Sequence, residues 1–247
     1  MPDILTHTEG GIATLTFNRL DKKNAITSAM YSEMVAFLQA AQADDAVRVA
    51  VFQGHEQVFS AGNDIADFLH NPAAGPEAPV MQFLHAISTF PKPLVAAVAG
   101  PAVGIGTTLL LHCDLVYAGD NAAFSMPFVN LGLCPEAGSS LLAPRLMGHV
   151  RAAEVLMLGE PFMAETALEM GLVNRVVPPG EVNALAQRQA AKLAAKPLQA
   201  LMQTKRLMKS GQSAAVQQQI ADEATTFARL LQSPEAKSAF AAFLQPR

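Results

Sequence analysis

The first seventeen residues contain a run in which apolar and polar side chains alternate. Ala13, Leu15 and Phe17 are separated by threonines, and the pair Gly10–Gly11 stands before this run. Alternation with a period of two is typical of a strand with one buried face, and a glycine pair favours a tight turn. We therefore predict a β-hairpin whose second strand covers residues 12–18.

Helical spacing and short apolar runs follow each other further along the chain. Apolar residues recur three and four positions apart up to Ala43, which predicts a helix capped by Thr27 or Ser28. Short apolar runs predict buried strands at 48–54, 93–100 and 114–119. Because the sequence between these strands is long enough for crossovers, we expect an α/β fold with a mostly parallel sheet.

The C-terminal part of the chain lacks strand patterns. From about residue 180 onward the sequence has the spacing of amphipathic helices, broken at Pro197 and Gly211. We expect residues 1–180 to form an α/β core and residues 181–247 to form a helical region. Proline and glycine within 71–79 predict a loop inside the core.

Composition narrows the classes of partner. The 247 residues carry a formal net charge of −4 with only 17 lysines and arginines, so we expect no nucleic-acid partner. No apolar segment reaches the roughly 18 residues of a membrane span, and the N-terminal residues lack a signal-peptide pattern. The two cysteines have no metal-binding spacing. We expect a cytoplasmic protein without a membrane or metal partner.

Two glycine-containing corners follow the predicted strands. One is Ser60–Ala61–Gly62 before Asn63, and the other runs from Gly100 through Gly104 and Gly106 into an apolar segment. Bare backbone before a helix exposes unpaired N–H groups that can bind a negatively charged oxygen. Each corner is equally compatible with a tight turn that only lets a helix pack on the sheet.

Five motifs, in order and spacing, resemble those of the crotonase family, the enoyl-CoA hydratases and isomerases. They are NRLDKKNAIT (18–27), FSAGNDIADF (59–68), AAVAGPAVGIG (96–106), CDLVYAGDNAAFSMP (113–127) and GLVNRVVP (171–178). The resemblance implies a crotonase-like ββα spiral, an α/β fold of two roughly perpendicular sheets. It also implies that the helical region 181–247 makes a homotrimer or a dimer of trimers.

In this family an acyl-CoA thioester oxygen lies between two backbone N–H groups. By motif position these look like the amides of Asn63 and Ile105, with Gly62 and Gly104 giving the close approach. One such donor is typically worth about 3 to 4 kcal/mol of transition-state stabilisation. The resemblance therefore predicts an oxyanion hole that stabilises an enolate.

The carboxylates of the family's hydratases are missing at the matching positions. Thr108 and Phe128 stand where the hydratase pattern has its two glutamates, and neither side chain is a general base at neutral pH. Glu136, in an otherwise uncharged apolar segment, is the replacement candidate, because apolar surroundings raise a carboxyl pKa. The residues alone leave open that Glu136 is a solvent-exposed cap of the following helix.

The glutamate of PEAGSS and the bulky Ile105 resemble the peroxisomal-type Δ3,Δ2-enoyl-CoA isomerases. In those enzymes one glutamate does the chemistry, which implies that Glu136 moves a proton from C2 to C4 of a 3-enoyl-CoA without a cofactor. We keep two alternatives. One is another crotonase-family enzyme, such as a hydratase or an aryl- or acyl-CoA hydrolase or isomerase. The other is a non-catalytic acyl-CoA-binding protein.

The resemblance also assigns positions to the rest of the acyl-CoA. Phosphates and adenine are expected near a basic turn and the first corner, and the acyl chain near apolar side chains. The residues assigned to the CoA moiety are Lys22, Lys23, Ala25, Ala61, Asp64 and Ile65. The expected walls of the acyl site are Ile65, Phe68, Phe128 and Leu133.

Overall fold

The main sheet has six strands. The computed structural model describes residues 2–70 and 75–244, so the predicted loop at 71–79 lies partly outside the described residues. The sheet order is β1-β2-β3-β4-β6-β9. Its strands are β1 (Ile4–Glu9), β2 (Ile12–Phe17), β3 (Val49–Gln53), β4 (Leu94–Val98), β6 (Leu115–Gly119) and β9 (Arg175–Val177). β1 and β2 form the predicted antiparallel hairpin, and all other pairs are parallel.

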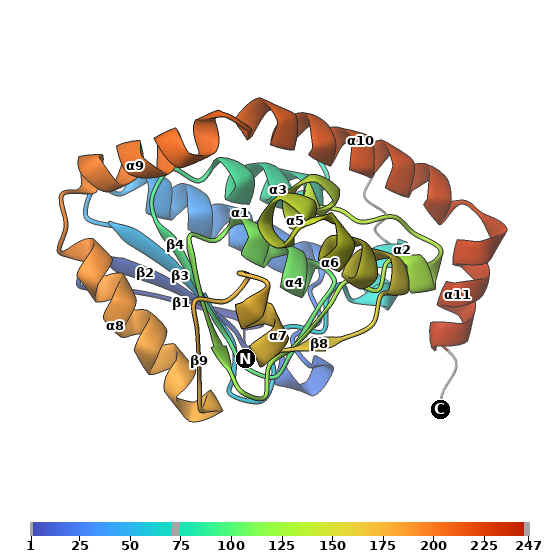
Figure 1. Ribbon diagram of the computed structural model, residues 1–247, viewed down its shortest axis with the longest axis horizontal. Coiled ribbons are helices and arrows are strands. Elements are labelled where there is room, and N and C mark those ends of the chain that lie inside the picture. Colours follow the sequence, from blue (N-terminus) through green and yellow to red (C-terminus); the bar gives the residue numbers. More distant parts are fainter. Residues whose placement is uncertain (1, 71–74, 245–247) are drawn as a thin grey trace.

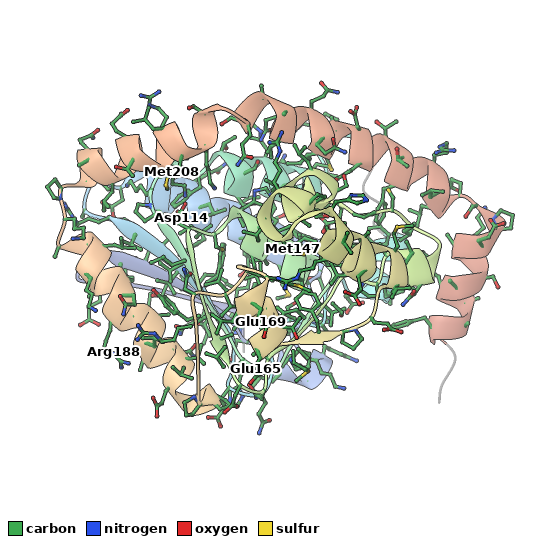
Figure 2. The ribbon with its side chains drawn as sticks, in the orientation of Figure 1. Asp114, Met147, Glu165, Glu169, Arg188 and Met208 are labelled. Atoms are coloured by element: carbon green, nitrogen blue, oxygen red, sulfur yellow. The ribbon has the colours of Figure 1, made fainter. Side chains whose placement is uncertain are left out.

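Helices cover both faces of this sheet, which is why β3 and β4 are apolar throughout. Val49, Val51 and Val95 belong to a cluster with α8 (Val182–Ala194), whereas Ala50 and Phe52 belong to the larger core. On that larger side lie α1 (Ser28–Ala43) and α3 (Pro79–Thr89), as Figure 1 shows. Arg188 points away from the sheet on the exposed side of α8 (Figure 2). The alternation of side chains across each strand thus assigns residues to two cores.

A second sheet of three strands lies beyond the end of β4. Its order is β5-β7-β8, with β5 (Pro101–Val103), β7 (Ala123–Ser125) and β8 (Phe162–Met163). β5 follows β4 after only Ala99 and Gly100, so the second glycine corner contains a short strand that we did not predict. The strand leads into α4 (Ile105–Thr108) and a 3₁₀ turn, η2 (Leu109–His112). The predicted two-sheet α/β fold is confirmed.

Helical segments complete the middle of the chain. They are η1 (Leu20–Lys22), α2 (Ile65–His70), η3 (Val129–Leu131), α5 (Ser139–Met147), α6 (His149–Ala153), the π-helix η4 (Glu154–Leu158), α7 (Ala164–Glu169) and η5 (Pro179–Glu181). Thr27 caps α1 as predicted, because its Oγ1 accepts from the N–H of Met30. α2 begins at Ile65, two residues after Asn63 of the first glycine corner.

The C-terminal helices arch over the core. α9 (Leu198–Ser210), α10 (Ser213–Leu231) and α11 (Pro234–Leu244) form a continuous arc in Figure 1, with α10 passing over α3 and α5. Lys205 anchors α9 through a buried ion pair with Asp114, 2.6 Å between Nζ and Oδ2, and Figure 2 labels Asp114 beneath this helix. The helical nature of 181–247 is confirmed; its role in assembly stays a prediction. None of the described helices is long and apolar enough to cross a membrane.

Candidate active site

The first corner leaves the backbone N–H of Asn63 without a partner. Ile26 pairs with Asn63 as an isolated parallel bridge. In this bridge the N–H of Ile26 donates to the carbonyl of Gly62 at 2.8 Å, and the N–H of Asp64 donates to Ile26 at 2.9 Å. The neighbours of Asn63 make the bridge bonds, so its own N–H points away. Across residues 2–70 and 75–244, no hydrogen bond uses this N–H.

The second corner does the same for Ile105. Gly104 has φ 55° and ψ −120°, a conformation that L-residues avoid. Its N–H donates to Ser125, and its carbonyl accepts from Thr107 and Thr108 at 2.9 Å each. Ile105 begins α4, so its N–H has no carbonyl in a preceding turn. Within the described chain this N–H also has no partner.

The two corners are held against each other. Ser60 pairs with Ala102 as a parallel bridge, and the N–H of Val103 donates to Ser60 at 2.9 Å. A Cβ on Gly62 would lie 2.8 Å from the Val103 carbonyl oxygen, so this approach requires glycine. Both corners border one cavity of about 440 Å³. Asn63 and Ile105, whose amides are free, thus border the same cavity. Two free backbone N–H groups on one cavity are what an oxyanion hole requires.

Glu136 lies on a neighbouring apolar cavity. This second cavity has a volume of about 310 Å³, and Asn63, Phe68 and Phe227 border both cavities. The Thr108 hydroxyl donates to Oε1 of Glu136 at 2.5 Å. The carboxyl group of Glu136 therefore lies beside Thr108, which stands where the hydratase pattern has its first glutamate. Glu136 is partly buried and α5 begins only at Ser139, so it is not a solvent-exposed helix cap.

Burial gives Glu136 an unusual affinity for protons. It raises the pKa of Glu136 to about 8; the Thr108 hydrogen bond opposes this rise, and the charge of Glu223 adds to it. A carboxyl group with a pKa near neutrality both accepts and returns a proton efficiently. The environment of Glu136 thus suits a general base that must also act as an acid.

Tyr31 links the two sides of the site and was missed by our sequence analysis. Its hydroxyl donates to Oδ1 of Asn63 at 2.5 Å, and the residue is 4% exposed. Burial, followed by the charge of Glu136, raises the pKa of Tyr31 well above its ordinary value. Tyr31 thus stays protonated and fixes the Asn63 side chain. It was missed because Tyr31 lies on the buried face of α1, where its sequence spacing is that of a core residue.

Glu223 is a second carboxylate that we missed. It is 5% exposed, and it accepts from the backbone of Gly138 and Ser140 just after Glu136. A signal existed in the sequence, because Val216, Ile220 and Glu223 follow helical spacing. This spacing places a charged residue on the buried face of α10.

The structure brings most, but not all, of the predicted residues to the cavities. Those on the first cavity are Ala61, Gly62, Asn63, Ile65, Phe68, Gly104, Ile105, Phe128 and Leu133. Glu136 borders the second, and Thr108 contacts it. The remaining candidates, Lys22, Lys23, Ala25 and Asp64, are not among the lining residues of either cavity.

Asp64 and Ala25 instead share a partner that fixes the first corner. Nη1 of Arg19 lies 2.7 Å from Oδ2 of Asp64 and also donates to the Ala25 carbonyl at 2.9 Å. Burial alone would raise the pKa of Asp64, but Arg19 holds it below its ordinary value. Lys22 and Lys23 are exposed at the end of η1. The ion pair joins the basic turn to the first glycine corner.

No group of three His, Cys, Asp or Glu side chains among residues 2–70 and 75–244 is arranged to hold a metal ion. Neither cysteine has the setting of a nucleophile, since burial raises the pKa of Cys113 to about 12 and raises that of Cys134 as well.

Known proteins are similar to this chain in sequence and in fold. The model of a family described as "Enoyl-CoA hydratase/isomerase" matches residues 7–247. "Enoyl-CoA delta isomerase 2" of Rattus norvegicus is 45% identical over 181 residues, which cover 71% of this chain and 46% of the rat protein. The aligned part therefore spans about half the length of that relative. The "2,3-dehydroadipyl-CoA hydratase" of Escherichia coli (strain K12) is 33% identical and covers all of this chain and 97% of its own. The solved structure of Pseudomonas aeruginosa OdaA is 48% identical, with a TM-score of 0.97 over the full length of both chains.

Proposed function

Because the chain belongs to the enoyl-CoA hydratase/isomerase family, we propose that it is an isomerase that converts a 3-enoyl-CoA into a 2-enoyl-CoA. The observation that carries this proposal is a single carboxyl group, Glu136, with a pKa raised to about 8, on a cavity that adjoins the one bordered by two residues with unpaired backbone amides. The hydratase positions hold Thr108 and Phe128 instead of carboxylates. One base suffices for isomerisation, whereas the standard hydration site uses two.

The reaction moves one proton and two electron pairs. The Glu136 carboxylate removes a proton from C2, and the electrons of that bond form a dienolate whose charge lies on the thioester oxygen. The N–H groups of Asn63 and Ile105 stabilise this oxygen. The carboxyl group of Glu136 then gives the proton to C4, and the double bond forms between C2 and C3. No electrons leave the substrate, so the proposal includes no cofactor; coenzyme A is part of the substrate.

The second cavity supports an apolar acyl group. Its apolar lining comes mainly from α3 and α10: Val80, Met81, Leu84, Ile220, Ala224, Phe227, Ala228 and Leu231. Among its described lining residues there is no lysine or arginine to meet a terminal carboxylate. Burying an unpaired charge costs several kcal/mol. We therefore expect 3-hexenoyl-CoA to react at least tenfold faster, by kcat/KM, than an analogue with a terminal carboxylate.

The test of the proposal is a pair of assays on the wild type and Glu136→Gln. We expect the wild type to convert 3-hexenoyl-CoA into 2-hexenoyl-CoA and to hydrate crotonyl-CoA only weakly. Glu136→Gln should lose about 10²- to 10⁴-fold in isomerisation, the usual contribution of a general base. Fast hydration of crotonyl-CoA would favour the hydratase alternative. Tight acyl-CoA binding without turnover would favour a binding protein, and unchanged isomerisation in the variant would reject Glu136 as the base.

We also propose that the protein acts in the cytoplasm as a homotrimer or a dimer of trimers. Exposed apolar side chains support an assembly: Val150, Met157 and Leu158 on α6 and η4 are 80%, 72% and 55% exposed. Leu207 and Met208 on α9 are also exposed. Side chains of this size are costly to leave in water in such number. Sedimentation at several protein concentrations tests the assembly, and a monomer at all of them would contradict it.

A further inference from the structure

The backbone directly after Glu136 is in a conformation that needs support. Ala137 has φ 61° and Gly138 has φ 70°, so a residue with a Cβ occupies the left-handed region one position after the carboxyl group. This conformation is unfavourable for an L-residue, because its Cβ crowds the backbone. Strain of this kind persists only when surrounding groups hold the chain.

A distant carboxylate holds one side of this segment. Oε2 of Glu223 accepts from the N–H of Gly138 at 2.5 Å. Oε1 accepts from both the N–H and the hydroxyl of Ser140, at 2.9 Å and 2.5 Å. These N–H groups stand at the start of α5, whose own N-cap residue, Gly138, has no side chain to cap it. Glu223, from α10, does the work of the missing cap.

A buried histidine holds the other side. Nε2 of His112, on η2, lies 2.7 Å from the Ala137 carbonyl oxygen, so this nitrogen carries the hydrogen that it donates. His112 is 2% exposed, and burial lowers its pKa to about 4. The ring is therefore neutral near pH 7. The Ala137–Gly138 peptide is fixed from two elements that are far from it in sequence.

We propose that Glu223 is a positioning residue for Glu136: from α10 it fixes the Gly138–Ser140 backbone and thereby the place of the Glu136 carboxyl group. This inference rests on the proposed function of Glu136. Docking of α10 then completes the active site. Gly138 and Ser140 of the α/β core donate these three hydrogen bonds, and in the described structure their acceptor, Glu223, comes from α10.

The charge of Glu223 gives this arrangement a measurable signature. Three donors and no acceptor face its carboxylate, which favours the ionised form, although burial raises its pKa. The groups that face Glu136 are Glu223 from α10, Tyr31 from α1 and Thr108 from α4.

Cys134 also lies within reach of Glu136, since the charges of Glu223 and Glu136 raise the pKa of its thiol and that of Arg229 lowers it. Lys209 and Lys205 act on His112 and not on Glu136. Among all these groups, Glu223 is the anion that raises the proton affinity of Glu136. Removing its charge should lower the pKa of Glu136 below about 8.

The test compares Glu223→Gln with Asp222→Asn, a matched control. Asp222 is the preceding residue on α10; it is exposed and accepts from Gln218. The first readout is the pH profile of isomerisation. We expect Glu223→Gln to move the midpoint of kcat/KM to lower pH by about one unit and to reduce kcat about tenfold with KM little changed. Asp222→Asn should leave all three unchanged.

The second readout does not need activity. Glutamate carrying ¹³C at the carboxyl carbon is incorporated, and the Glu136 signal is assigned as the one missing from Glu136→Gln. Its titration midpoint should fall in Glu223→Gln and stay in Asp222→Asn. A midpoint and a kcat that match the wild type in Glu223→Gln would overturn the inference.

A third variant covers the case in which Glu223→Gln does not fold. Ser140→Ala removes the hydroxyl that donates to Glu223 and accepts from Gln219, and it keeps the backbone N–H that also donates to Glu223. It should lower kcat two- to threefold without a change in KM. Unchanged kinetics in this folded variant would then overturn the inference. If the wild type itself fails to isomerise 3-enoyl-CoA, the proposed function falls, and the carboxyl titration alone decides the role of Glu223.

Discussion

The two halves of the candidate site are built in different ways. The oxyanion half consists of backbone: the free amides of Asn63 and Ile105 come from loops that bond to each other and to nearby turns. The base half consists of one side chain, Glu136, which depends on Thr108, on His112 and on Glu223 from the last quarter of the chain. A backbone site needs glycine at fixed positions, whereas a side-chain site needs partners from distant elements. Substitutions in the two halves should therefore have different effects on kcat, on the pKa of Glu136 and on stability.

After the loss of the base itself, the largest expected effect comes from breaking the backbone half. Gly104→Ala adds a Cβ at φ 55° and ψ −120°, so the chain must rotate and the Ile105 N–H turns away from the cavity. We expect kcat for isomerisation to fall about 10²- to 10³-fold, the usual loss for one oxyanion donor. The carboxyl titration of Glu136 should not move. A variant with wild-type kcat would show that this amide is not used.

The next effect is on the free energy of unfolding, and it measures how much the buried Glu136 destabilises the fold apart from its role in the reaction. Its pKa is about 8 in the folded state and near 4.5 in the unfolded state, so the folded state holds the proton more tightly. The contribution of Glu136 to the free energy of unfolding is therefore most favourable below pH 4.5 and is lost as the pH rises to about 8. Glu136→Gln does not titrate, so its advantage over the wild type should grow across this window to a few kcal/mol. Urea unfolding at pH 5 and pH 8.5 checks this, and an equal difference at both would contradict it.

A smaller effect, opposite in sign to that of Glu223→Gln, is expected at Thr108. Its hydroxyl bond lowers the pKa of Glu136, so Thr108→Val, which keeps the shape, should raise that pKa further. The midpoint of the pH profile should move to higher pH by about half a unit, and activity at pH 7 should fall about threefold. A shift to lower pH would show that this hydrogen bond does not stabilise the carboxylate.

The smallest effect is expected at the residue that joins the two halves. Tyr31→Phe removes the hydroxyl that donates to the Asn63 side chain but leaves both backbone amides in place. We expect a loss of about 1 kcal/mol in unfolding free energy and about a twofold loss in kcat. Thermal unfolding and steady-state kinetics measure the two. A loss as large as that of Gly104→Ala would mean that the Asn63 side chain itself takes part in the reaction.

The same contrast explains how far the sequence could predict the molecule. The hairpin, the strands β3, β4 and β6, the cap at Thr27 or Ser28 and the two glycine corners depend on neighbouring residues, and local patterns predicted them. The shorter strands β5, β7, β8 and β9 were not predicted. Glu136 was predicted as a candidate, but its partners were not. Glu223 and His112 meet the Ala137–Gly138 peptide only after the chain has folded. Helical spacing marked Glu223 as buried, but no spacing rule says which helix end a buried carboxylate will cap.

The central claim is that one carboxyl group both removes and returns the proton. The most direct measurement is the fate of the label when 3-hexenoyl-CoA with deuterium at both C2 positions is converted in ordinary water. At the earliest conversions we expect part of the 2-hexenoyl-CoA product to carry deuterium at C4, delivered by Glu136. Product with hydrogen alone at C4, at every conversion from the first turnover onward, would contradict the direct return of the removed proton by Glu136.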